Sequence, residues 1–421
     1  MRLKLLLLFF LISSGISIYA QVKVIEKIEF SGIKKLNKDF LNKILYSKQN
    51  EVLDSILIQN DIQALNRLNG VSKTNVKITN STNPNFVILT YEIIENHTLI
   101  PTLSIGTTQT NGTYRVGLYE YNFLGKNITL GGFYQYNDFN SFGICYLAPQ
   151  YFNKNVGFGI NIQRLVSLEP VYLNNNTANY KYSNTAAEII SNYNLNVKNE
   201  LKFATTIFNE NYQNLTNNIT LDFPLKVNYT KLLVKFVYNY NNINYNFYQL
   251  EGFKSILNLQ TVATNFNLNN LFLIGWNDFS YYKNLGSNFN LASRFRLGIA
   301  DNTLSPFAPF AIDNNINLRG VGNLVGRATG TIVINTEIRK TLFEKKWFVL
   351  QGNAFLDCGS FRNAGGKLSD FTNKNNIKAF SGLGLRLIHK TIFNAIFRID
   401  YGVGLTNNAP KGIVFGIGQY F

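Results

Sequence analysis

Apolar and polar residues alternate through the last quarter of the chain. In residues 331–339, Asn335 and Glu337 share one face of the pattern, and isoleucines dominate the other face. Residues 347–357 alternate in the same way, with Gln351 and Asn353 on the polar face. Successive side chains of a strand point to opposite faces, so each segment predicts a strand with one apolar side. A soluble β-sandwich would also give such strands.

The same pattern recurs from Pro101 onward, with Asn, Gly or Pro in the intervening turns and no convincing helix. An even number of tilted strands of about ten residues is typical of a transmembrane antiparallel β-barrel, whose closure leaves no unpaired edge in lipid. We therefore expect residues 101–421 to form such a barrel of about 16 strands. The predicted strands are 102–108, 113–122, 127–137, 141–149, 156–166, 178–190, 198–208, 231–242, 254–266, 269–281, 289–300, 328–340, 346–357, 378–388, 391–404 and 411–421.

The first twenty residues resemble an export signal. Arg2 and Lys4 precede an apolar run, and Ala20 supplies a small residue before a cleavage point. A membrane anchor is the alternative, but a helix needs about 20 apolar residues to span the membrane. We expect residues 1–20 to be a signal peptide, and therefore expect the mature protein outside the cytoplasm.

Residues 22–97 predict a small α+β domain that precedes the barrel. A strand-like segment comes first, and Asn37 can then cap a short amphipathic helix. A second helix carries Ile58, Ile62 and Leu65 at helical spacing and is expected to stop at Gly70. Two further alternating segments complete the order β-α-α-β-β.

Composition and motifs argue against several functional classes. The formal net charge is +16, but no run of five basic residues occurs, so we expect no nucleic-acid partner. The aromatic content of 14% suits the interfacial girdles of a barrel. His97 and His389 are the only histidines, and neither a zinc-binding motif, a phosphate-binding loop nor a serine elbow is present. We expect a protein that is not an enzyme and needs no metal or cofactor.

Residues 120–126, 146–152, 318–321 and 355–359 resemble motifs of the BamA/TamA-like outer-membrane β-barrel family, also called the bacterial surface antigen family. The first two segments are similar to the family's turns after the second and fourth strands. Leu318-Arg319-Gly320-Val321 resembles the Arg-Gly motif of the sixth extracellular loop, although Val321 stands where the family usually has an aromatic residue. Residues 355–359 resemble the strand motif that receives the arginine. The N-terminal domain resembles a single POTRA domain, the periplasmic module of this family.

The resemblance implies a latch inside the barrel, in which the arginine of the loop binds acids on the inner wall. In this sequence, the resemblance assigns Arg319 and Gly320 to the loop side of the latch. It assigns Glu337, Asp357 and Gly359 to the wall side. The alternation agrees, because Glu337 and Asp357 both fall on polar faces. A shielded guanidinium also needs a carboxylate partner. A surface arginine with unrelated acids is the alternative.

The end of the sequence resembles the last two strands of the family. Tyr401 and Phe421 are the aromatic residues that we expect to act as a barrel-insertion signal. Such a signal is shared by unrelated outer-membrane barrels, so it bears on location more than on function.

The resemblance implies an outer-membrane factor that assembles, inserts or translocates proteins, either as an accessory or for specific clients. Its expected partners are outer-membrane lipids, unfolded or secreted clients and other subunits of an assembly machinery. A passive pore and a surface adhesin on the same scaffold are the alternatives, although neither needs a POTRA-like domain or an Arg-Gly loop.

Overall fold

The computed structural model describes residues 23–107, 112–173, 176–215, 225–246, 248–265, 267–301, 309–312, 317–321, 326–363, 366–406 and 409–421. The expected signal peptide lies outside these ranges. None of the helices in the described part is both long and apolar enough to cross a membrane.

The N-terminal part is a small α+β domain with the predicted order of elements. Its elements are β1 (Val24–Ser31), α2 (Lys38–Ile44), α3 (Ser55–Asn66), β2 (Val71–Asn80) and β3 (Phe86–Glu95). The sheet order is β1-β3-β2, with β1 parallel and β2 antiparallel to β3.

Both helices of this domain begin at a side-chain cap. Asn37 accepts a hydrogen bond from the backbone N–H of Phe40 at 2.8 Å, and Asp54 accepts one from Ile56 at 2.7 Å. Helix α3 ends at Asn66, before the predicted stop at Gly70, because i→i−3 hydrogen bonds from Arg67 and Leu68 tighten its end. Leu68 nevertheless remains buried in the core of the domain.

Beyond this domain, most of the described residues form one antiparallel sheet of 16 strands, which confirms the predicted fold class. Neighbours along the chain pair throughout, except that β14 pairs directly with β17. The strands are β4 (Leu99–Thr107), β5 (Gly112–Phe123), β6 (Ile128–Tyr136), β7 (Asn140–Ala148), β8 (Val156–Leu173), β9 (Asn176–Asn194), β10 (Asn199–Asn214), β11 (Lys226–Asn246), β12 (Gln249–Thr264), β13 (Asn267–Asn284), β14 (Phe289–Ala300), β17 (Gly330–Glu344), β18 (Phe348–Arg362), β19 (Ile377–His389), β20 (Ile396–Gly404) and β21 (Lys411–Ile417). Between β14 and β17 lies a hairpin of β15 (Phe310–Ile312) and β16 (Gly326–Ala328), and the short helices η1 (Leu368–Thr372) and η2 (Lys374–Asn376) precede β19.

Strand lengths differ from the prediction at two places. Strands β8 to β13 have 16 to 21 residues, and each continues past at least one of its predicted limits, whereas β20 has nine residues and β21 has seven. The last strand was predicted to reach residue 421 but ends at Ile417. Gly418 adopts a φ of 87°, a left-handed conformation that breaks the strand and that glycine tolerates best.

The predicted alternation of faces is confirmed in β17. Ile334 and Ile338 are 48% and 46% exposed on the outer surface, while Asn335 and Glu337 are buried on the inner side. The outer wall is thus apolar and the inner wall polar, as a barrel in lipid requires. We call the enclosed space the lumen.

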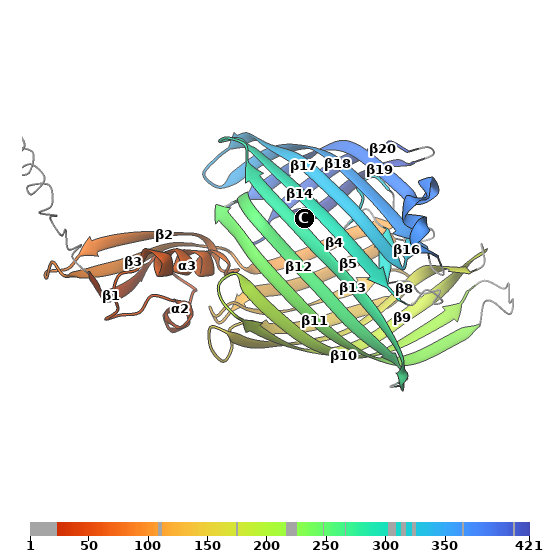
Figure 1. Ribbon diagram of the computed structural model, residues 1–421, viewed down its shortest axis with the longest axis horizontal. Coiled ribbons are helices and arrows are strands. Elements are labelled where there is room, and N and C mark those ends of the chain that lie inside the picture. Colours follow the sequence, from red (N-terminus) through yellow and green to blue (C-terminus); the bar gives the residue numbers. More distant parts are fainter. Residues whose placement is uncertain are drawn as a thin grey trace, which may run out of the picture.

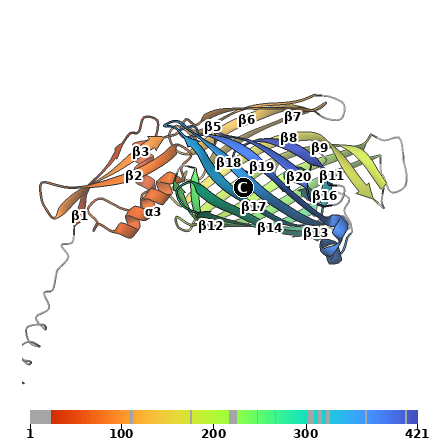
Figure 2. The same cartoon turned by 90° about the horizontal axis from the view of Figure 1, so that it is seen from above.

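The N-terminal domain lies against one end of the barrel, which we call the proximal end (Figure 1, Figure 2). Asn37 donates its backbone N–H to the carbonyl of Gly125 in the β5–β6 turn at 3.1 Å. The guanidinium of Arg67 donates to the carbonyl of Asn241 at 2.7 Å, and the Ser72 hydroxyl donates to that of Lys390 at 2.6 Å. These contacts reach three separate parts of the barrel mouth, so the domain covers it from several sides.

Candidate functional site

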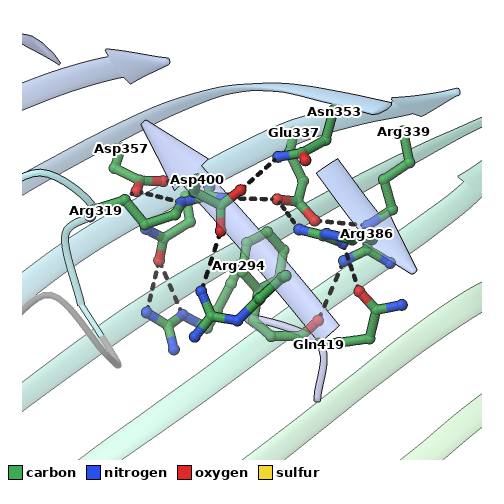
Figure 3. Close-up of polar contacts among 12 residues, drawn as sticks. Arg294, Arg319, Glu337, Arg339, Asn353, Asp357, Arg386, Asp400 and Gln419 are labelled. Atoms are coloured by element: carbon green, nitrogen blue, oxygen red, sulfur yellow. Dashed lines mark hydrogen bonds and ion pairs between the residues drawn. The ribbon is translucent and has the colours of Figure 1, made fainter. Parts of the chain in front are cut away.

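Residues 317–321, between β14 and β17, lie in the lumen, where Arg319 contacts the inner wall. The Arg319 side chain has no exposed surface. Its Nε and Nη2 donate to the two oxygens of Asp357 at 2.8 and 2.9 Å, and its backbone N–H also donates to Asp357 at 3.0 Å (Figure 3). Such a forked, charge-assisted pair fixes the direction of the guanidinium as well as its position.

Glu337 is the common acceptor of three arginines. Its carboxylate accepts hydrogen bonds from Arg319 at 2.6 Å, from Arg386 at 2.7 Å and from Arg339 at 2.6 Å (Figure 3). Asp400 lies 3.8 Å from Arg319 and pairs with Arg398 at 3.1 Å. Four arginines and three carboxylates therefore form one buried network, in which each charge has a partner of opposite sign.

Aromatic rings enclose the Arg319 guanidinium on two sides. Its central carbon lies 3.7 Å from the ring centroid of Phe355 and 4.4 Å from that of Tyr420. Cation–π contacts of this kind are strongest where water is excluded. The two rings contact the faces of the guanidinium, whereas the hydrogen bonds lie along its edge. The rings and the hydrogen bonds together fix its orientation.

Glycines let the loop backbone approach the wall closely. Gly320 has a φ of 96°, and a Cβ atom there would lie 3.0 Å from the backbone of Gly402 in β20. A Cβ atom on Gly359 would lie 3.2 Å from Leu318. Both predicted glycines of the latch therefore lie where the loop contacts the wall. Val321 packs in an apolar cluster with Leu318 and Phe361.

The residues after Gly418 turn into the lumen and join the network. Gln419 accepts a hydrogen bond from Arg386, and Tyr420 lies under Arg319. The backbone carbonyl of Phe421 accepts a hydrogen bond from Arg339 at 3.3 Å. Phe421 lies inside the barrel in both ribbon views (Figure 1, Figure 2).

The structure separates the two aromatic residues that the sequence predicts as an insertion signal. Tyr401 is 44% exposed on the outer wall, whereas Phe421 contacts Arg294 and Arg339 in the lumen. Arg386, Arg398, Asp400 and Tyr420 were not among the predicted site residues. The alternation in the last strands could have identified the first three as facing the lumen, but it does not indicate their partners.

The charged groups of this network are ion-paired with each other. Among the described residues, no group of three or more His, Cys, Asp or Glu side chains is arranged to hold a metal ion. The arrangement can fasten a loop and hold it in one position.

The chain resembles solved barrels in structure rather than in sequence. No protein-family model and no curated protein sequence matches it. BamA from Haemophilus ducreyi lacking POTRA domains 1–3 aligns over 93% of this chain and 83% of its own, with a TM-score of 0.54 and 16% identity. CdiB from Escherichia coli aligns over 94% and 75%, with a TM-score of 0.64 and 12% identity. CdiB from Acinetobacter baumannii aligns over 94% of this chain and 73% of its own, with a TM-score of 0.60 and 16% identity.

The chain has the fold of the BamA and CdiB barrels. This fold covers the N-terminal domain as well as the barrel, because the alignments span nearly the whole chain.

Proposed function

We propose that this protein resides in the outer membrane and inserts or translocates client proteins there, as an accessory or client-specific factor with its N-terminal domain in the periplasm. The observation that carries the proposal is the combination of a domain docked on the barrel mouth with a loop fastened inside the lumen. A passive pore or an adhesin needs neither part. The likeness to BamA and CdiB, an assembly protein and a transporter, supports the same class.

The N-terminal domain would receive the client in this proposal. Strand β2 is at an edge of its sheet and, among the described residues, pairs only with β3. An extended client segment can add to such an edge through backbone hydrogen bonds. In this proposal the client would pass from that edge through a cavity of about 520 Å³ between the domain and the barrel, which is lined partly by Arg67, Asn239 and Lys390.

The Arg319 loop would act as the latch that holds the barrel in one state. We expect its release to be costly, because breaking one partner of a buried ion pair leaves an uncompensated charge. The latch stabilises the folded barrel in this proposal, and its position sets how much of the lumen is free.

The seam between β4 and β21 is where the wall would open towards the membrane. The sheet order begins at β21 and ends at β4, and no ladder joins these two strands within the described residues. Both are short, and β21 contains Gly412 and Gly416. A strand with few side chains to pack separates at a lower cost than the long strands β8 to β13.

The experiment is deletion of residues 22–97 in cells that lack the wild-type protein. We expect the barrel to reach the outer membrane and its clients to be lost from the membrane or the medium, which a comparison of outer-membrane and secreted proteins would detect. Cross-linking followed by capture of the intact protein would identify the clients. Normal levels of every outer-membrane and secreted protein would instead favour the pore or the adhesin.

A further inference from the structure

The inner wall of the barrel carries an apolar patch, although the lumen is otherwise polar. On β13, Leu271 and Leu273 are 45% and 56% exposed on the outer wall, and the intervening Phe272 and the next residue, Ile274, therefore face the lumen. Neighbouring strands add apolar residues at the same level. The buried members of the patch are Ala186, Phe208, Val262, Ile274 and Ala300, with Leu233, Phe272 and Trp276 packed beside them.

Charged pairs border this patch. Lys231 pairs with Glu210, and its ammonium lies 5.7 Å from the ring centroid of Phe272. Lys235 pairs with Glu188 at 2.7 Å on the inner face of the neighbouring strands. Phe310 is among the residues packed against this apolar cluster, and an apolar patch with a polar border is typical of a binding site once the side chain that covers it leaves.

Phe310 of the loop hairpin occupies part of the patch. Its ring lies so close to β14 that a Cβ atom on Gly298 would come within 2.7 Å of it. It meets the edge of Trp276 at a centroid distance of 6.3 Å and an interplanar angle of 89°. The packing of Phe310 therefore shows that a phenylalanine side chain fits this surface.

A second contact ties the same hairpin to the facing part of the wall. Arg327 of β16 donates to Glu169 of β8 from Nη2 at 2.8 Å and from Nε at 3.2 Å. Six strands, β9 to β14, separate β8 from β17 in the sheet, whereas Arg319 is fastened on β17 and β18. The described residues of the loop are thus fastened to two parts of the wall that lie far apart in the sheet.

We propose that the apolar patch is a binding site for aromatic and large aliphatic side chains of an extended polypeptide in the lumen, and that Phe310 occupies this site until the Arg327–Glu169 contact releases the hairpin. The Arg319 latch stays in place during this release, because its partners lie on other strands. This inference rests on the proposed function in one respect, because the polypeptide that binds in the lumen is the client of that function.

The test measures current through the purified full-length protein in a planar lipid bilayer. The variant Phe310→Ser with Arg327→Gln should conduct more than the wild type while keeping its heat-resistant folded form. Glu169→Gln weakens the same ion pair through its partner on the wall and leaves the loop sequence unchanged. This variant should also raise the current.

The probe is a flexible peptide of Gly, Ser and Asn that carries phenylalanines, compared with the same peptide in which serine replaces each phenylalanine. In the opened variant the phenylalanine peptide should block the current on the order of tenfold longer, the effect of burying one such side chain. Ile274→Asn in the opened variant should remove this difference. Thr206→Asn, at a polar position of the same inner face, should retain it.

Equal blocking times for the two peptides in the opened variant would overturn the inference. Wild-type current in both opened variants would overturn it as well, because the hairpin would then not occlude the lumen. The measurement uses no cells and no client, so its failure is distinct from a failure of the deletion experiment on the proposed function.

Discussion

Gly402 lies directly beneath Gly320, and neither position has room for a side chain. A Cβ atom on Gly402 would lie 2.6 Å from the carbonyl oxygen of Arg319 and 3.0 Å from the Cα of Gly320. The position of the latch is therefore set by backbone contact with β20 as well as by its ion pairs.

Gly402→Ala should push the loop away from the wall and lower the temperature at which the folded barrel unfolds in detergent. Its cross-strand partner Gly412 provides the matched control, because a Cβ atom there would meet only the Gly320 oxygen, at 4.0 Å. Gly412→Ala should leave that temperature nearly unchanged. Equal effects of the two substitutions would show that the unfolding temperature depends on the glycine content of the last strands and not on the contact with the loop.

Arg319→Ala and Asp357→Ala should have strongly non-additive effects on stability. Each single substitution leaves a buried charge without its main partner, which typically costs about 3–5 kcal/mol, whereas the double substitution removes both charges. The control is Arg296 with Asp278, a pair whose side chains are 18% and 15% exposed and whose coupling should be smaller. Purely additive effects for Arg319 and Asp357 would mean that the latch contact contributes nothing.

Gly125→Ala should detach the N-terminal domain from the barrel mouth. Gly125 has a φ of 71°, and a Cβ atom there would lie 2.2 Å from the carbonyl oxygen of Lys35. Gly286→Ala carries a similar backbone strain in another turn, with no atom within 4 Å of the added carbon. Protease cleavage near residues 96–98 should rise for the first variant only. Equal cleavage of both variants would assign the effect to strain in a turn rather than to lost docking.

The stability of the N-terminal domain should decrease above about pH 10. Burial, and then the 2.6 Å hydrogen bond to Asp61, raises the pKa of Tyr91 above its ordinary value. The folded domain therefore keeps this proton where the unfolded chain loses it, and stability that is complete below the ordinary pKa declines as the pH rises above it.

Urea unfolding of residues 22–97 at about pH 8 and about pH 11 measures this decline. Tyr91→Phe should be less stable by about 1–3 kcal/mol at the lower pH, because a buried acceptor loses one donor, and its decline should be shallower. Some decline should remain, since burial also raises the pKa of Tyr46. An unchanged decline in the variant would exclude Tyr91 as its source.

The sequence predicts the strands of the barrel well because lipid imposes a strict alternation on the outer wall. Every predicted strand from residue 102 onward overlaps one strand of the sheet. The predicted end of β21 was wrong because the left-handed conformation of Gly418 ends the strand, although the residues that follow it continue the alternating pattern. The length of β8 to β13 was underestimated, since strand pairing continues through Asn-rich segments, such as residues 243–246, that the prediction left in turns.

The site was predictable only where a motif indicated a partner. The contacts of Arg319 with Glu337 and Asp357 join residues that the resemblance had already related. Alternation places Arg386 and Asp400 on the inner face, but it does not show which of many inner residues they meet. The pairing of Arg327 with Glu169 joins strands far apart in the sheet, and no local pattern encodes it.

The Arg327–Glu169 contact limits how wide the barrel can become. Strands spaced about 4.8 Å apart and tilted by about 40° each occupy about 6 Å of circumference, so one added strand would widen the barrel by about 2 Å. A hydrogen bond of 2.8 Å does not survive such a stretch. Under the proposed function, adding a client strand to the wall and keeping the Arg327–Glu169 pair intact therefore exclude each other. The pair would then respond to the diameter of the barrel, and growth of the wall at the seam would itself release the hairpin.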